Sequence, residues 1–274
     1  AYVFASGDLF FAVDPQHGGR VVSFALAGEN VLTGPDANAT NYGSTFWTSP
    51  QSDWGWPPPP AIDDLSYAVS IDGGTLILRG SDDRSLGVHV TKVFSVDAVS
   101  GVVSIEYSIQ NSGAASRSLA PWEITRVHPG GIVFFPSGAT AHSADSGPAL
   151  PTLQAAGTTW FDGFDGDATP PSGNTKYFAD GTRGWLARAS AGTVFVKKFP
   201  QVPADAHAPG ESAIEIYVSG DRAYVELENQ GAYALLAPGA SVHWTVRWYL
   251  VKAPNGLDAS VGSAELVSFV DGLR

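Results

Sequence analysis

Residues 222–251 read RAYVELENQGAYALLAPGASVHWTVRWYLV, and their alternation of polar and apolar residues predicts two or three long strands joined by short turns. Side chains two positions apart in a strand point to the same face. Glu226 and Glu228 therefore share one face of the first strand, and Val225 and Leu227 share the other. The stretch thus places two carboxylates side by side on one face of a sheet.

An unpaired charge is costly to bury, so this face must meet water, a cation such as Arg247, or a polar ligand. A plain solvated sheet face is the alternative to a binding site. The following strand, 241–250, repeats the alternation and predicts a core face made of Val242, Trp244, Val246, Trp248 and Leu250.

Two motifs of this stretch are similar to the C-terminal segment of the galactose mutarotase (aldose 1-epimerase) superfamily. They are Leu227-Glu228-Asn229-Gln230 and Leu235-Leu236-Ala237-Pro238-Gly239, which precede a closing Trp-rich strand. A third stretch, FWTSPQSDWGWPPP at 46–59, resembles the signature of an uncharacterised bacterial branch of that superfamily. The resemblance implies a large antiparallel β-sandwich, and it gives Glu228 the place of the catalytic base.

Residues 41–60, NYGSTFWTSPQSDWGWPPPP, combine aromatic residues with a run of prolines that cannot continue a β-ladder. The segment is therefore expected to be a loop, either packed down as a lid or exposed as a platform for a ligand. A sugar ring offers an apolar face to Trp and hydroxyls to polar side chains. Gln51, Asp53, Trp54 and Trp56 are accordingly expected to bind substrate.

The strand expected at 116–127, SRSLAPWEITRV, follows an Asn-Ser-Gly turn, as the strand that bears the catalytic His does in mutarotases. Glu123 stands in that neighbourhood. The nearest histidine, His128, comes about five residues later and is a further catalytic candidate, with a capping or solvent-facing residue at a strand end as the alternative. Glu123 is a candidate acid if burial raises its pKa. A carboxylate pair of Glu123 and Glu228 would also suit glycosidic-bond chemistry. The alternative for Glu123 is a structural ion pair with Arg126 or Arg247.

Residues 137–176 contain aromatic residues scattered among Gly, Pro and Asp, which favours an irregular second rim of the site. Trp160 is expected to contact substrate there. Arg126, Glu226 and Arg247 complete the expected substrate contacts. Asp162, Asp165 and Asp167 resemble a calcium loop but fit no EF-hand spacing, and an ordinary acidic turn is the alternative. The histidines show no zinc motif and no phosphate-binding loop occurs, so we expect no metal and no cofactor.

The remaining alternating segments predict a meander of strands at 65–70, 75–80, 87–96 and 102–111 and further strands at 184–189, 193–199 and 213–219. Near the C-terminus, Ser263 can cap a short helix, which we expect to close an edge of the sandwich. The predicted fold is an all-β, large antiparallel β-sandwich of galactose mutarotase type with a short C-terminal helix. One domain is expected to span 1–274.

The charge balance of the chain limits the kinds of partner that it can bind. The chain of 274 residues carries 15 Lys and Arg against 27 Asp and Glu, a net charge of −12, which disfavours nucleic acid and anionic membranes. It has no Cys, which excludes disulfides and thiol catalysis, and no Met, which favours a trimmed, secreted or periplasmic protein. We expect a monomer.

The function predicted from these features is binding of a carbohydrate ring in a cleft lined by aromatic residues and carboxylates, with aldose 1-epimerase activity as one form of it. A non-catalytic carbohydrate-binding protein on the same scaffold is the alternative. A polysaccharide lyase or glycoside hydrolase is the third possibility.

Overall fold

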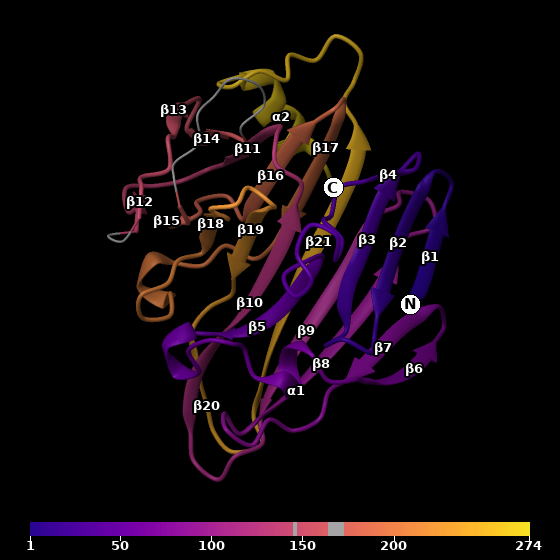
Figure 1. The fold of residues 1–274 in the computed structure, drawn as a ribbon, viewed down its shortest axis with the longest axis vertical. Helices are drawn as coiled ribbons and strands as arrows, with labels where there is room; N and C mark the ends of the chain where they lie inside the picture. Colours follow the sequence, from indigo (N-terminus) through magenta and orange to yellow (C-terminus); the bar gives the residue numbers. More distant parts are fainter. Residues whose placement is uncertain (145–146, 164–172) are drawn as a thin grey trace.

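The computed structural model describes residues 1–144, 147–163 and 173–274, which form two large antiparallel sheets packed face to face (Figure 1). This is the predicted β-sandwich. Short helical segments lie at η1 (Gln51–Asp53), α1 (Pro60–Asp63) and η2 (Ala204–Ala206), and a longer helix, α2 (Ala264–Gly272), lies near the C-terminus.

Within the described residues, the first sheet has eleven strands, of which nine follow the order β1-β2-β3-β5-β10-β19-β18-β15-β12, with β4 beside β3 and β20 beside β10. In chain order, they are β1 (Tyr2–Ser6), β2 (Leu9–Asp14), β3 (Arg20–Leu26), β4 (Glu29–Asn30), β5 (Ser44–Ser49), β10 (Arg117–Val127), β12 (His142–Ser143), β15 (Thr175–Ala179), β18 (Ile214–Val218), β19 (Val225–Gln230) and β20 (Ala234–Leu236).

The described part of the second sheet has ten strands in the order β13-β14-β11-β16-β17-β21-β9-β8-β7-β6. In chain order, they are β6 (Ala68–Asp72), β7 (Thr75–Arg79), β8 (Val88–Val96), β9 (Val103–Asn111), β11 (Ile132–Phe135), β13 (Leu153–Ala155), β14 (Thr158–Asp162), β16 (Trp185–Ser190), β17 (Thr193–Lys198) and β21 (Ser241–Lys252). The predicted meander is β6 to β9.

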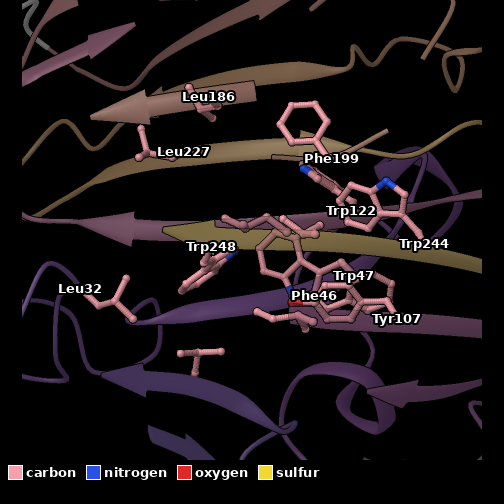
Figure 2. Close-up of a cluster of buried hydrophobic side chains, with 14 of the residues drawn as sticks. Leu32, Phe46, Trp47, Tyr107, Trp122, Leu186, Phe199, Leu227, Trp244 and Trp248 are labelled. Atoms are coloured by element: carbon pink, nitrogen blue, oxygen red, sulfur yellow. The ribbon is translucent and has the colours of Figure 1, made fainter. Parts of the chain in front are cut away.

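Aromatic side chains fill the space between the sheets (Figure 2). Phe24 of the first sheet packs edge-on against Phe195 of the second, with ring centroids 5.7 Å apart. Phe46 stacks on Tyr107 across the same interface at 4.1 Å. The expected core face of β21 is confirmed for Trp244, Val246, Trp248 and Leu250, which are all buried. Burial of this apolar surface on both inner faces is what joins the two sheets.

The C-terminal helix forms where the sequence predicts it, because the Ser263 side chain accepts a hydrogen bond from the N–H of Leu266 at 3.1 Å. Its position differs from the expectation. Leu266, Val267 and Val270 pack with Trp185, Val196 and other residues on the outer face of the second sheet, and not at an edge of the sandwich. An amphipathic helix buries more apolar area on a sheet face than at an edge.

The described parts of 137–176 are less irregular than predicted, since β12, β13 and β14 lie within them. β14 pairs with β11 and with β13, so this part of the chain extends the second sheet. The described chain contains no helix that is long and apolar enough to cross a membrane.

Candidate functional site

The candidate site is built from cross-strand neighbours on the outer face of the first sheet. Strands β15, β18, β19, β10 and β5 lie side by side there, and their registers align two rows of side chains across the sheet. The residues of one row are Phe178, Glu215, Glu228, Ile124 and Thr45, and those of the next are Lys176, Tyr217, Glu226 and Arg126. The pairing continues through β19 without a bulge, so Glu226 and Glu228 share a face as predicted.

A cavity of about 550 Å³ lies over these rows, and we call it the first cavity. Its size is that of a small-molecule site. It is lined by Asn41, Trp47, Gln51, Trp56, Trp122, Ala144, Asn174, Lys176, Phe178, Gly210, Glu211, Tyr217, Tyr224, Glu226 and Glu228.

Glu228 lies at the floor of the first cavity with only 1% of its surface exposed. Its Oε1 accepts a hydrogen bond from Lys176 Nζ at 2.6 Å, and its Oε2 accepts one from Trp122 Nε1 at 2.9 Å. Burial raises the pKa of Glu228 to about 8, although the charge of Lys176 opposes the rise. At neutral pH this side chain can therefore hold a proton or release one.

Lys176 is the cation of the site, and its side chain is 21% exposed. Besides Glu228, its Nζ forms an ion pair with Glu215 Oε2 at 2.7 Å, and it lies over the Trp122 ring at 5.3 Å. Burial by itself would lower the pKa of Lys176, but the attraction of Glu215 and Glu228 outweighs it and raises the pKa. The lysine stays charged, so it can stabilise negative charge in the cavity.

Two further carboxyl groups stand near this lysine. Glu215 is fully buried, and its Oε1 accepts hydrogen bonds from Gln230 Nε2 at 2.7 Å and from the N–H of Ser212 at 2.9 Å. Burial raises the pKa of Glu215 to about 7. Glu211 lines the cavity itself. Burial raises its pKa, although the hydrogen bond from the N–H of Gln51 and the charge of Lys176 both act to lower it. One lysine thus faces several carboxyl groups that are not all ionised near pH 7.

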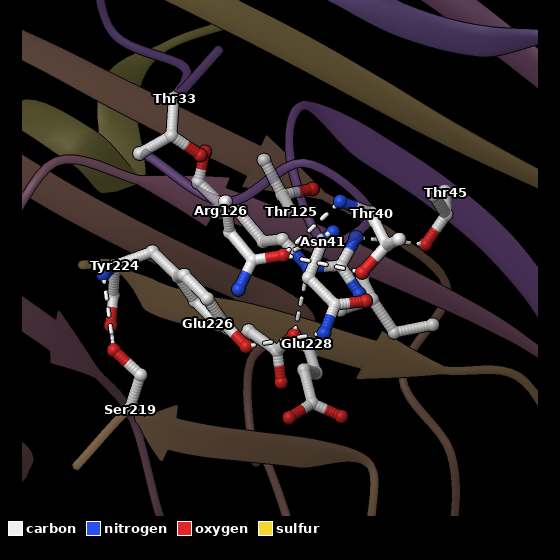
Figure 3. A network of polar contacts seen from close by, with 12 residues as sticks. Thr33, Thr40, Asn41, Thr45, Thr125, Arg126, Ser219, Tyr224, Glu226 and Glu228 are labelled. Carbon is white, nitrogen blue, oxygen red and sulfur yellow. Dashed lines mark hydrogen bonds and ion pairs between the residues drawn. The ribbon is translucent and has the colours of Figure 1, made fainter. Parts of the chain in front are cut away.

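Glu226 meets a different cation. Its Oε1 accepts a hydrogen bond from Arg126 Nε at 2.8 Å, and Arg126 Nη1 donates to Thr45 Oγ1 at 3.2 Å (Figure 3). The guanidinium also lies over the Trp47 and Tyr224 rings, at 5.4 and 5.9 Å. Arg126 therefore holds Glu226 in place beneath the cavity. The cation that pairs with Glu226 is Arg126 and not Arg247, which the sequence suggests as a candidate.

Contrary to the expectation, residues 41–60 are not a loop throughout, because strand β5 (Ser44–Ser49) lies within them and pairs with β10. The Trp-rich loop is the part after β5, and it contributes to the first cavity through some of its predicted residues. Trp56 is 60% exposed and lines the cavity together with Gln51. Trp54 is half-buried, donates from Nε1 to the carbonyl of Thr48 at 2.9 Å, and packs on Trp47. Asp53 is exposed and is not among the lining residues. The loop is thus a platform at Trp56 and a packed lid at Trp54.

Glu123 does not lie in the cavity, contrary to the expected pairing with Glu228. Its side chain points between the sheets, is fully buried, and forms an ion pair with Lys197 Nζ of β17 at 2.8 Å. Its carboxylate also accepts hydrogen bonds from Tyr107 Oη at 2.7 Å and Trp248 Nε1 at 3.1 Å. Odd and even positions of a strand face opposite ways, so Trp122 faces the cavity and Glu123 cannot.

Three other predicted site residues lie elsewhere. His128 is exposed at the end of β10, where its carbonyl accepts a hydrogen bond from Arg188 Nη2. Trp160 is buried on the outer side of the second sheet, stacked on Phe134 at 4.8 Å. Arg247 is exposed on β21 of the second sheet. None of the three lines the first cavity, because each belongs to another strand end or to the other sheet.

The acidic turn considered for calcium is only partly described. Asp162 ends β14 and is exposed, while Asp165 and Asp167 lie outside the described residues. Within the described ranges, no group of three or more His, Asp or Glu side chains is arranged to hold a metal ion.

Three members of the site, Lys176, Glu211 and Glu215, are not among the residues predicted from the sequence. The signal for Glu215 was present, because Ile214, Ile216 and Val218 alternate with it in the same manner as the residues around Glu226 and Glu228. Strand alternation indicates a face, but it does not indicate which strands are neighbours. The convergence of β15, β18 and β19 is decided by the order of strands in the sheet.

Known structures with the same arrangement define the class of this fold. The chain superposes on a putative aldose 1-epimerase from Escherichia coli K12 with a TM-score of 0.59 and 15% identity, over 92% of this chain and 98% of that one. A galactose mutarotase-like protein from Lactobacillus casei ATCC 334 gives a TM-score of 0.61 and 12% identity, over 91% and 99% of the two chains. The protein therefore has the galactose mutarotase-like fold, as its sequence motifs predict.

A protein from Synechocystis sp. PCC 6803 is similar to the same extent, with a TM-score of 0.63 and 13% identity over 92% of this chain and 95% of that one. No curated protein sequence matches the chain. A family model described as "Domain of unknown function (DUF4380)" matches residues 4–251, and the chain belongs to this family.

Proposed function

We propose that the protein binds the ring of a sugar in the first cavity and transfers protons at its anomeric centre, as an aldose 1-epimerase does. The observation that carries the proposal is Glu228, a buried carboxyl group with a pKa of about 8 at the floor of an aromatic-walled cavity. A general base is most effective when its pKa lies near the working pH. The mutarotase-like fold supports a carbohydrate-related role.

The cavity walls suit a sugar ring. The aromatic side chains of Trp47, Trp56 and Tyr217 offer faces and edges to its C–H groups, and Asn41 and Gln51 offer hydrogen bonds to its hydroxyls. Asn41 is fixed in this position because its Nδ2 donates to Tyr224 Oη at 3.4 Å. A neutral polyol needs this mixture of apolar and polar contacts, and it has no net charge for the acidic chain to repel.

The proton transfers assign a role to each ionisable group. Glu228 in its ionised form takes the proton of the anomeric hydroxyl, while an acid protonates the ring oxygen as the bond between the anomeric carbon and that oxygen breaks. Glu211 fits the acid, because it lines the cavity and burial raises its pKa. Lys176 holds its proton too tightly to donate it and serves to steady the charge on Glu228. After rotation about the carbon–carbon bond, the reverse transfers close the other anomer.

The test is polarimetry of anomer interconversion with freshly dissolved D-glucose, D-galactose and D-mannose. Glu228→Gln is expected to lower the rate constant kcat by about 10²- to 10⁴-fold, because the amide keeps the shape but cannot take a proton. Glu211→Gln is expected to do the same if it is the acid. Glu106→Gln is the matched control, since Glu106 is exposed on the second sheet and its nearest ionic partner is His243.

Non-catalytic sugar binding is the second candidate, and one observation favours it. Both carboxylate oxygens of Glu228 already accept a hydrogen bond, from Lys176 and from Trp122. A carboxylate engaged in this way can serve to shape the cavity floor without meeting the anomeric hydroxyl. Calorimetric titration of the same sugars separates the candidates: a wild-type protein that binds a sugar without accelerating its interconversion is a binding protein.

The hypothesis of a polysaccharide lyase or glycoside hydrolase loses its original support, because it requires Glu123 and Glu228 to face the same cavity. That residue faces the space between the sheets, on the side of the strand away from the cavity.

A further inference from the structure

A second cavity of about 430 Å³ lies next to the first one. Two residues, Asn41 and Trp56, line both cavities. Among the residues that line only the second cavity are Arg20, Ala39, Tyr42, Asp63 and Asp64. The two cavities therefore meet at the Trp56 side chain.

The Trp56 side chain borders both cavities. Its ring is 60% exposed, and it contacts the Trp47 ring edge-on at 5.9 Å. An indole anchored on one side by another Trp and open elsewhere keeps surface available toward both cavities. This exposed ring contributes little to the core and is free to contact a ligand in either cavity.

The second cavity also has polar groups held in fixed positions. Arg20 is 4% exposed; its Nη1 donates to the carbonyl of Thr40 at 2.6 Å, and its Nη2 forms an ion pair with Asp63 at 3.3 Å. The guanidinium lies over the Tyr42 ring at 4.4 Å. Arg20 Nε is buried and has no hydrogen-bond partner among the described residues. A buried donor without a partner is costly, which favours a ligand or water that supplies the acceptor.

The walls of the two cavities are connected through Asp63. Its Oδ2 pairs with Arg20, and its Oδ1 accepts a hydrogen bond from Trp47 Nε1 at 2.7 Å. Trp47 lines the first cavity and Arg20 lines the second. Asp63 therefore links a wall residue of the first cavity to a wall residue of the second.

We propose that the second cavity is a further sugar subsite, so that the ligand is an oligosaccharide with one ring on each side of Trp56. This inference rests on the proposed function: the reducing-end ring lies over Glu228, where its anomeric hydroxyl is free. The preceding ring lies in the second cavity, where Tyr42 and Trp56 meet its apolar surface and Arg20, Asp63 and Asp64 meet its hydroxyls.

The experiment compares single sugars with their β-1,4-linked dimers by calorimetric titration. The probes are D-glucose with cellobiose, D-galactose with galactobiose, and D-mannose with mannobiose. At least one dimer is expected to bind about tenfold more tightly than its single sugar, because the second ring adds contacts in the second cavity.

Two variants test whether the gain in affinity for the dimer comes from the second cavity. Ala39→Trp fills the second cavity from an exposed position, so it is expected to remove the tenfold gain and leave the affinity for the single sugar unchanged. Asp64→Ala, also exposed, is expected to reduce the gain. Ala98→Trp, in the exposed turn between β8 and β9, is the matched control and is expected to keep it.

The results separate failure of the second subsite from failure of the proposed function. Equal affinity for a single sugar and its dimer, or a gain that survives Ala39→Trp, overturns the second subsite and leaves the proposed function standing. Failure of every probe to bind overturns the proposed function, and the subsite falls with it.

Discussion

Two glutamates of this protein have nearly the same immediate contacts and opposite surroundings. Glu123 accepts from a lysine at 2.8 Å and from a Trp N–H at 3.1 Å, and Glu228 accepts from a lysine at 2.6 Å and from a Trp N–H at 2.9 Å. Glu123 and its lysine, Lys197, are completely enclosed between the sheets. Glu228 lies on the outer face, beneath a cavity.

The difference lies in charge balance and in access. Lys197 faces one glutamate and also donates to Thr125 Oγ1 and to the carbonyl of Leu227, so the enclosed pair is neutral and satisfied. Lys176 is shared by Glu215 and Glu228 and is partly exposed. A balanced, closed pair fixes the packing of two sheets, whereas an unbalanced, open one leaves a carboxyl group able to exchange a proton.

The largest expected effect is on stability at the enclosed pair. Glu123→Gln leaves the Lys197 charge buried without a counter-charge, so the free energy of unfolding is expected to fall by about 3–5 kcal/mol. Urea denaturation followed by Trp fluorescence measures the change. The double variant Glu123→Gln with Lys197→Met should recover part of the loss, because neither of the two replaced side chains then carries a charge between the sheets. A single variant as stable as the wild type would mean that the pair does not hold the sheets.

A smaller loss is expected at the open pair. Lys176→Met leaves Glu215 and Glu228 without their cation, which is expected to cost about 1–3 kcal/mol at pH 8. Partial exposure of Lys176 screens the effect, so it stays below that of Glu123→Gln. At pH 5 the carboxyl groups are protonated and the loss should shrink. Denaturation at the two pH values checks this, and an equal loss at both would contradict the ionisation assigned to the site.

The pH dependence of stability should distinguish the two glutamates as well. The pKa of Glu228 is raised from 4.5 to about 8 in the folded state, so between these values the folded protein binds more protons than the unfolded chain. Its contribution to stability is complete below pH 4.5 and is lost as the pH rises to about 8, at no more than about 1.4 kcal/mol per pH unit for one proton.

Glu228→Gln should flatten this fall, since the amide does not titrate. Unfolding curves of the two proteins at intervals from pH 5 to pH 8 give the comparison. Parallel pH profiles would show that Glu228 keeps an ordinary pKa.

The smallest effect on stability is expected in the Trp-rich loop. Trp56→Ala should change the free energy of unfolding by less than about 0.5 kcal/mol, because the side chain is mostly exposed, while it weakens sugar binding. Trp54→Ala should destabilise more, because Trp54 packs against Trp47 and Trp122. Thermal melts and calorimetric titrations of both variants test the pair. Equal melting temperatures would contradict the distinction between platform and lid.

The sequence by itself determined the strands and the faces of individual residues. Alternation in 222–251 located β19 and β21, put Glu226 and Glu228 on one face, and marked most of the buried residues of β21. The two alternating segments on either side of Asp72-Gly73-Gly74, a turn signal, located β6 and β7 in the same way. These features are local, because a two-residue period and a turn signal are written in consecutive residues.

Only the tertiary structure decided which faces meet. Glu123 and Trp122 are adjacent in the chain. Glu123 forms an ion pair with Lys197 between the sheets, whereas Trp122 donates a hydrogen bond to Glu228 in the cavity. Lys176 reaches Glu215 and Glu228 because β15, β18 and β19 are neighbours in the first sheet. Strand order depends on contacts between residues far apart in the chain, and the burial that shifts the pKa of Glu228 arises only once those contacts have formed.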